Sequence, residues 1–522
     1  MSEPKQVDAG RTIGDLEAML QKDRENPQLL RELAQVYGEQ KQWDGHIDAL
    51  SRLYELTGDA ESAMELGDAI RQHGSDPLAC IDAYNRVLDA DSGNVVPLAI
   101  MENLLTEAKA WERLDDVYRR QLARLPGNDT PGKIILLKKL LDMYRSAGMT
   151  DQAAEALRLL ADMDHAAAAD YHMQRGALYL ADREHWPHAM VAFEDAVRSN
   201  PFDPEPYQRL FELNYNLEQF DKAFVHTAAL HYLHGGDATA REFFNQQSPD
   251  EAVEAMDILG PELWHGAVTP EQGRSEAGQI CSVLYHHVDN IVLSHPKKAG
   301  LHKHDHLPLT ESLNFCSTVG YVNSIIDAPL PKVYLQSGQG ERISVAPVYP
   351  GTIVIPTNAF ENYPQQDLLF HIGRAATLAR PSHVLATVYR ADKLRAWLEA
   401  AVTVIDDQYR PGTDEDMLAS MRKNIARGLP RKQRPVLEKY VERFVALQDS
   451  FDFGQWYRSI FFTANRAGLI VCNDLSCAMG WVEAYGQGEG EQWVQDQKAD
   501  LLRFWISEEY AYIRRLLGFS IV

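Results

Sequence analysis

Small and hydrophobic residues recur with a helical spacing through the first half of the chain. The clearest unit is residues 175–203, RGALYLADREHWPHAMVAFEDAVRSNPFD. Its marked positions are Gly176, Tyr179, Trp186, Ala189, Phe193, Ala196 and Pro201. Residues three or four apart share one face of a helix, so this spacing predicts two antiparallel helices that pack through small residues. Trp186 lies in the turn between them, and Pro201 ends the second helix because proline cannot continue it.

The same marks recur along the chain at a nearly constant interval. Tyrosines recur 35 and 36 residues apart, and alanines 35 and 34 residues apart, at Tyr144, Tyr179, Tyr215, Ala154, Ala189 and Ala223. This order and spacing resembles the tetratricopeptide repeat (TPR), whose period is about 34 residues. We therefore expect a TPR-like α-solenoid of about six helix pairs over residues 12–235.

A stack of helix pairs buries its hydrophobic faces only between neighbours, and it leaves a concave groove. The resemblance implies that this groove binds a protein or peptide. The alternative is that the repeats only pack onto the rest of the chain. The positions expected to pack the repeats are Gly176, Tyr179, Ala189, Phe193, Ala196, Pro201, Tyr215 and Ala223. No Lys/Arg pair recurs at matching first-helix positions, so the pattern does not name a partner.

The repeat pattern ends at His234-Gly235-Gly236, and a different pattern follows. Two short alternating runs, 332–336 (KVYLQ) and 342–347 (RISVAP), flank Ser337-Gly338-Gln339-Gly340, which predicts a β-hairpin. Residues 352–355 (TIVI) predict a third strand. Helices are expected at about 275–294, 366–379, 390–408, 414–427, 431–449, 453–480 and 489–516. The predicted fold is mainly α: repeats at 12–235, a connecting segment at 236–264, and an α-rich α+β domain at 265–522.

One helix of this second half is framed like the zinc helix of a metallopeptidase. In an HExxH helix, two histidines one turn apart hold Zn²⁺ and the glutamate is the general base. Residues 367–386, DLLFHIGRAATLARPSHVLA, resemble in their framing positions Phe370 and Gly373 the active-site helix of gluzincin metallopeptidases of the CAAX-protease and HtpX type. The first ligand, the glutamate and the second ligand then fall on Arg374, Ala375 and Leu378.

A second segment supports the same resemblance. Residues 461–474, FFTANRAGLIVCND, resemble the E-x-x-A-D-R-A-G-L stretch in which those peptidases carry the third ligand and an aspartate. Here the glutamate is replaced by Phe461 and the aspartate by Asn465. A guanidinium does not deprotonate in a protein, and Ala, Leu and Phe offer no donor atoms. The resemblance therefore implies a pseudopeptidase without catalytic residues, metal or cofactor.

Arg374 places a positive charge where a relative would hold a cation. It could pair with a buried acid and keep the former active-site cleft rigid, or it could bind a carboxylate of a bound peptide. The alternative is an ordinary amphipathic helix whose arginine points to solvent.

The run 301–306, LHKHDH, is the densest group of histidines. Alternate residues of an extended segment share a face, so His302, His304 and His306 could chelate a transition metal. Lys303 and the following Pro308 favour a solvated loop instead. A basic run at 422–434 suggests either a solvated helix junction or a docking surface for an acidic partner or for the acidic repeat array itself.

The composition of the chain excludes further classes of function. The 522 residues include 51 Lys+Arg against 75 Asp+Glu, a net charge of −24, which argues against binding to nucleic acid. The sequence contains no run of eighteen apolar residues, so it predicts no membrane span. The start lacks the pattern of a secretory signal, and the five cysteines show no metal-like spacing, so we expect a reduced, cytoplasmic protein.

These observations favour a non-catalytic scaffold or adaptor that binds partners through the TPR groove, with the pseudopeptidase domain as a second surface. An enzyme with an unrecognised site, such as a metal centre at His302–His306, is one alternative. A structural assembly subunit is another. The sequence indicates neither the partner's identity nor the oligomeric state.

Overall fold

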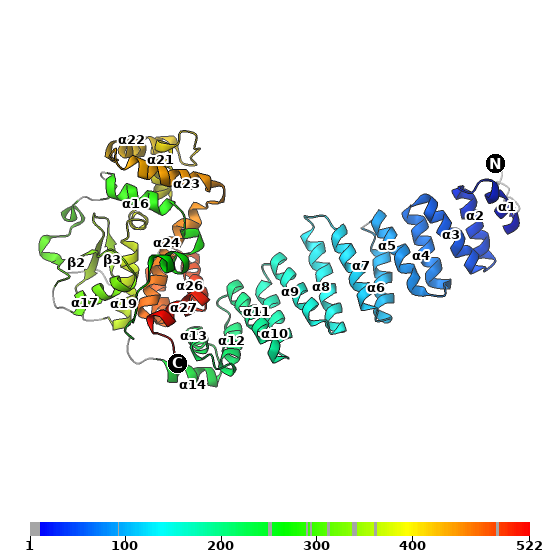
Figure 1. Ribbon diagram of the computed structural model, residues 1–522, viewed down its shortest axis with the longest axis horizontal. Coiled ribbons are helices and arrows are strands. Elements are labelled where there is room, and N and C mark those ends of the chain that lie inside the picture. Colours follow the sequence, from blue (N-terminus) through cyan, green and yellow to red (C-terminus); the bar gives the residue numbers. More distant parts are fainter. Residues whose placement is uncertain are drawn as a thin grey trace, which may run out of the picture. The chain divides into compact units, whose positions relative to one another are not determined.

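The computed structural model describes residues 11–91, 93–248, 253–288, 291–292, 295–310, 314–336, 342–359, 363–486 and 490–521. The chain forms two compact units, Met1–Ala192 (unit 1) and Phe193–Val522 (unit 2). The predicted fold class is confirmed: helices dominate, a helical repeat array comes first, and a small four-stranded sheet lies in the second half (Figure 1). None of the described helices is long and apolar enough to cross a membrane.

Unit 1 is a row of helices that pack against their neighbours in chain order (Figure 1, blue to cyan). Its helices are α1 (Ile13–Lys22), α2 (Pro27–Glu39), α3 (Trp43–Thr57), α4 (Ala60–His73), α5 (Cys80–Ala90), α6 (Val95–Glu107), α7 (Trp111–Arg124), α8 (Thr130–Ala147), α9 (Thr150–Met163) and α10 (Ala168–Tyr179). The pairs α2–α3, α4–α5, α6–α7 and α8–α9 are each in contact. The next helix, α11 (Trp186–Ser199), crosses the boundary between the units.

The first helix of each of these pairs begins with a side-chain cap, whereas the second does not. Asn26, Asp59, Asn94 and Asp129 each accept a hydrogen bond from a backbone N–H of the first turn of α2, α4, α6 and α8. Such caps satisfy N–H groups that have no partner inside the helix. No side-chain cap precedes α3, α5, α7 or α9. The regular caps mark where each pair starts.

Small residues allow these helices to approach closely, as the repeat pattern predicted. A Cβ atom on Gly67 of α4 would lie 2.6 Å from Cε1 of Tyr84 in α5. Tyr84 is fully buried and donates a hydrogen bond to Asp68 (2.8 Å). The glycine therefore makes room for the aromatic ring of its partner helix.

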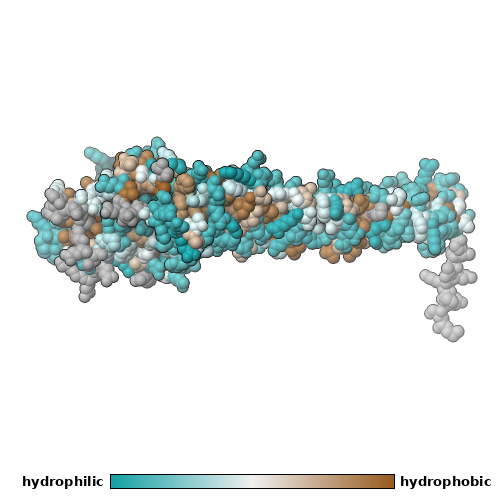
Figure 2. All heavy atoms as spheres, turned by 90° about the horizontal axis from the view of Figure 1, so that it is seen from below, coloured by the Kyte–Doolittle hydropathy of each residue, from teal (hydrophilic) through white to brown (hydrophobic). Residues whose placement is uncertain are grey.

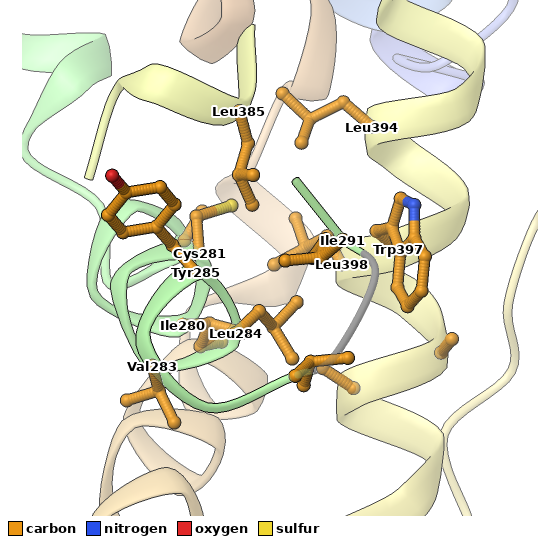
Figure 3. Close-up of a cluster of buried hydrophobic side chains, with 14 of the residues drawn as sticks. Ile280, Cys281, Val283, Leu284, Tyr285, Ile291, Leu385, Leu394, Trp397 and Leu398 are labelled. Carbon is orange, nitrogen blue, oxygen red and sulfur yellow. The ribbon is translucent and has the colours of Figure 1, made fainter. Parts of the chain in front are cut away.

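Unit 2 contains most of the sequence-distant packing. Its long helices are α12 (Pro204–Asn216), α13 (Phe220–Tyr232), α14 (Ala238–Gln247), α16 (Ala277–His287), α17 (Asn314–Ile325), α19 (Gln365–Leu378), α21 (Ala391–Ile405), α22 (Glu415–Gly428), α23 (Arg434–Ala446), α24 (Phe453–Cys472), α25 (Leu475–Gly486), α26 (Glu491–Trp505) and α27 (Glu508–Leu517). Short helices α15 (Pro261–Leu263) and α20 (Val384–Val388) connect them. One core cluster joins α16, α20 and α21 through residues that include Cys281, Leu385 and Trp397 (Figure 3).

Two of the predicted helices are each divided in two. The predicted helix 453–480 is wrong, because α24 ends at Asn473, whose left-handed backbone (φ 48°) turns the chain before α25. The predicted helix 489–516 is wrong as well. There, Ser507 accepts a hydrogen bond from the N–H of Tyr510 and starts α27 as a separate helix.

The small sheet has the order β1–β2–β4–β3, with strands β1 (His306–Leu307), β2 (Lys332–Gln336), β3 (Ser344–Ala346) and β4 (Thr352–Pro356). The predicted hairpin is wrong, because β4 lies between β2 and β3, parallel to β2 and antiparallel to β3. All five residues of β4 are buried, as expected for a central strand. The predicted turn residues 337–340 lie outside the described residues.

The last two helices of the predicted repeat region, α12 and α13, belong to unit 2. Residues near the end of the chain form hydrogen bonds with α13. Arg514 of α27 is fully buried and donates to Asp221 of α13 (2.7 Å) and to Asn473 (2.6 Å). The indole N–H of Trp505 donates to the backbone oxygen of Val225, also in α13 (2.7 Å). The limits 12–235, 236–264 and 265–522 stay a prediction, since the two compact units divide the chain at residue 192.

Candidate binding sites

The two segments that resemble metallopeptidase motifs lie on α19 and α24, which cross at two glycines. A Cβ atom on Gly468 would lie 2.8 Å from the backbone oxygen of Phe370, and one on Gly373 would lie 2.7 Å from Cγ2 of Val471. Both distances are too short for an alanine without movement of a helix. The close crossing brings Arg374 of α19 beside Asn465 of α24.

Arg374 is half-buried and is held by neutral groups. Its Nε donates to Oδ1 of Asn465 (2.9 Å), and its guanidinium lies 3.9 Å from the centre of the Tyr485 ring. Asn465 in turn donates to Oε1 of Gln497 (2.8 Å). Burial lowers the pKa of Arg374. No carboxylate among the described residues lies within ion-pair distance, so the predicted buried acid is not found there, and the solvent-facing alternative is wrong.

His371, next to this site, is buried and neutral near pH 7. The hydroxyl of Tyr485 donates to the backbone oxygen of Ile343 (2.9 Å), so it accepts from Nδ1 of His371 (2.7 Å), which assigns the ring proton to Nδ1. Burial and the charge of Arg374 lower the pKa of His371 to about 3, and burial raises the pKa of Tyr485 to about 12. Neither group is poised to exchange a proton near neutral pH.

The other predicted vestigial positions are packing residues. Ala375 and Leu378 are buried, and the half-buried Phe461 ring lies edge-on to Trp493 with their centres 5.5 Å apart. Across the described parts of the chain, no group of three or more His, Cys, Asp or Glu side chains is arranged to hold a metal ion. The residues at these positions therefore offer hydrophobic contact and one positive charge.

The histidine run adopts a different geometry from the expected one. Residues Lys303–Asp305 form a 3₁₀ turn, so the extended alternation expected for His302, His304 and His306 is wrong. The rings of His302 and His304 stack with centres 5.4 Å apart, whereas His306 lies edge-on to Tyr334. The turn separates His306 from the other two rings. Whether the run binds a metal stays a prediction.

The positions expected to pack the repeats differ in burial. Gly176, Ala189, Phe193, Ala196, Pro201 and Ala223 are buried. Tyr179 is half-buried, and Tyr215 is 42% exposed, with its ring edge-on to Phe243 at a centre distance of 5.5 Å. Their shared role in repeat packing remains a prediction.

Unit 2 also carries a groove that the sequence did not indicate. Cavities of about 740 and 930 Å³ share the lining residues Glu271, Gln272, Arg274 and Gln455. The first shares Gly266, Ala267 and Glu509 with a cavity of about 710 Å³, and the second shares Phe444, Phe451 and Asp452 with one of about 680 Å³. We call these four adjoining cavities the unit 2 groove.

The arginines of the groove come from segments far apart in the sequence. Arg274 follows a 3₁₀ turn, Arg443 lies on α23, Arg458 on α24 and Arg503 on α26. Sequence spacing could not group them, because no local period connects residues brought together by tertiary packing. The one available signal was the polar first half of α26, where Gln492, Gln495 and Gln497 recur.

Comparison with known proteins returns TPR structures of low similarity. No protein-family model matches the sequence, and no curated protein is significantly similar to it. Solved structures similar to this chain include PilF of Pseudomonas aeruginosa (18% identity, 43% of this chain, 99% of that chain, TM-score 0.19). Two others are the TPR2AB-domain:pHSP90 complex of yeast Sti1 (16%, 45%, 90%, 0.18) and the TPR domain of P58(IPK) (9%, 94%, 92%, 0.18). At these scores, the repeat character of this chain rests on its own helix pairs.

Proposed function

We propose that this chain is a non-catalytic scaffold that binds a protein or peptide partner through its repeat array. The observation that carries this proposal is a hydrophobic surface on α6 and α8, the first helices of two successive pairs. Val95, Val96 and Ile135 are 73%, 51% and 59% exposed. Lys139 of α8 forms an ion pair with Glu102 of α6 (2.5 Å), so side chains of the two helices meet. Figure 2 shows a mostly hydrophilic surface on which hydrophobic residues gather in small groups.

The finer proposal is that unit 2 derives from a metallopeptidase-like fold and now acts as a second binding surface. Its support is that Arg374 and Asn465, which occupy the first-ligand and aspartate positions of the resemblance, are hydrogen-bonded to each other. Two glycines that frame those positions make the crossing possible. Metal analysis by mass spectrometry on protein without a histidine tag should find no stoichiometric zinc. Stoichiometric zinc would favour the alternative of an enzyme.

The scaffold proposal predicts that partner capture depends on the α6–α8 surface. The full chain, its V95S/V96S/I135S variant and an L330S control would be cross-linked in native extract, and the captured proteins identified by mass spectrometry. Leu330 is 66% exposed and lies in unit 2, so this control removes a hydrophobic side chain of similar exposure from a different part of the chain. We expect the same partner with the unmodified chain and the control, and a loss of roughly tenfold with the triple variant. Equal capture by all three contradicts the proposal, and recovery of only this chain favours an assembly subunit.

A further inference from the structure

We propose that the unit 2 groove binds an acidic segment of a partner polypeptide through Arg274 and Arg503. Both side chains are exposed and line the cavity of about 740 Å³. The site lies wholly in unit 2, so it does not depend on the hydrophobic surface of α6 and α8. If the repeats bind a partner, the groove would give the scaffold a second contact with a protein. If the repeats bind nothing, the groove could still bind its own ligand.

The two arginines are positioned by backbone carbonyls rather than by acids. Arg274 donates from Nε to the backbone oxygen of Thr269 (3.0 Å) and from Nη2 to that of Gly266 (2.6 Å). Arg503 donates from Nε to the backbone oxygen of Arg198 (2.9 Å). In the part of the chain that the structure describes, neither has an ion-pair partner. Each guanidinium is thus held in place with N–H donors left over, which is the arrangement that recognises a carboxylate.

Two further arginines extend the positive charge along the groove. Arg458 pairs with Asp496 (3.0 Å) and Arg443 with Glu276 (3.2 Å), and both arginine side chains are more than half exposed. Exposed ion pairs of this kind contribute little to stability and are screened by salt. A ligand carboxylate can therefore share these arginines without large loss to the fold.

The carboxylates that line the same two cavities are mostly engaged. Asp496 and Glu276 pair with the arginines above, and Asp500 forms a two-bond ion pair with the well-buried Arg466. Asp452 accepts the N–H of Gln455 as the cap of α24. Glu271 and Glu509 remain without an ion pair among the residues described. Among the residues described, no hydrogen bond holds either carboxylate, unlike the guanidiniums of Arg274 and Arg503, so the pre-positioned charge in this cavity is positive.

The cavity is also suited to a peptide backbone. Gln272, Gln455, Gln492 and Gln495 line it, and their amides can both donate to and accept from peptide groups. The adjoining cavity of about 930 Å³, which Arg274 and Arg443 line, leaves room for an extended segment rather than for a single ion. Short peptide ligands commonly combine backbone hydrogen bonds with one charged anchor.

The test compares three labelled peptides of alternating glycine with glutamate, glutamine or lysine on the full chain, by fluorescence anisotropy at low salt. We expect the glutamate peptide to bind at least tenfold more tightly than the other two, and its affinity to fall as salt is raised. A lysine peptide that binds as well or better, or a glutamate peptide that does not bind, overturns the proposal. This comparison needs no variant.

A pair of charge-matched variants then locates the site. R274Q/R503Q should weaken binding of the glutamate peptide by roughly tenfold, because charge-assisted hydrogen bonds are lost. R422Q/R434Q removes the same charge from two arginines outside the groove, the half-buried Arg422, which pairs with Glu415, and the exposed Arg434, which pairs with Glu438. It should leave affinity within about twofold. Equal weakening by both pairs would mean that only net charge matters and would overturn the assignment. If R274Q/R503Q unfolds, R503Q alone decides, since Arg503 makes one hydrogen bond at the surface.

Discussion

Unit 1 and unit 2 are stabilised by different kinds of contact. In unit 1, helices pack mainly against the helices next to them in the chain, and ion pairs such as Arg158–Glu155 are half exposed. In unit 2, the Arg514–Asp221 ion pair joins residues 293 positions apart, with the arginine side chain 1% exposed. Repeated local packing distributes stability over many similar interfaces. Unit 2 instead joins distant segments, through a hydrophobic core cluster and through buried polar contacts such as this ion pair.

The largest effect should come from removing the buried arginine of α27. R514M leaves the carboxylate of Asp221, whose side chain is 17% exposed, without its cation, and it removes the donor to Asn473. Breaking a buried ion pair from one side costs about 3–5 kcal/mol. We expect that loss in the free energy of unfolding of unit 2, measured by urea titration with hydrogen exchange resolved by segment.

The exposed Arg434–Glu438 pair provides the control. R434M should lower the stability of unit 2 by less than about 1 kcal/mol, because the pair is solvent-screened. Hydrogen exchange in α2–α9 should not change in either variant. A comparable loss of protection in those helices would show that the two units unfold together, and the contrast between them would fail.

A smaller effect is expected at the α19–α24 crossing. In G468A, the new methyl group would lie 2.7 Å from Cδ2 and 2.8 Å from the backbone oxygen of Phe370, so one helix must shift. Overpacking of this kind costs about 1–3 kcal/mol. G480A is the matched control, because nothing lies within 4 Å of its added carbon and alanine favours the helix by up to about 1 kcal/mol. Thermal unfolding should therefore move in opposite directions, and a shift of the same sign in both variants would contradict the close crossing.

The sequence predicts the structure of unit 1 better than that of unit 2. The helix pairs of unit 1 were predictable, because tyrosines and small residues that recur along the chain mark contacts between neighbouring helices, such as the one observed between Gly67 and Tyr84. The central place of β4 was not, because strand order depends on a crossover that the turn signal at 337–340 does not encode. The break at Asn473 was missed because a helical period continues on both sides of it.

The candidate sites show the same limit. Framing residues on α19 and α24 singled out Arg374 and Asn465, and these two residues are in contact. Tyr485 and Gln497, which complete the surroundings of the arginine, lie on other helices and belong to neither motif. The arginines of the unit 2 groove share no motif at all. A motif locates residues within one helix or one pair of helices, whereas an electrostatic environment is assembled from the whole fold.

The smallest effect should come from Arg374, where two contributions oppose each other. R374M leaves Oδ1 of the buried Asn465 without its donor, which costs about 1–3 kcal/mol, but it also removes a charge that burial disfavours. We expect a net loss of about 1 kcal/mol in urea unfolding. A double-mutant cycle with N465A should return a coupling of similar size if the hydrogen bond is responsible. No change and no coupling would mean that the charge has no structural role. A gain in stability would mean that the arginine is retained despite destabilising the fold, as expected for a residue that receives a carboxylate from a bound peptide.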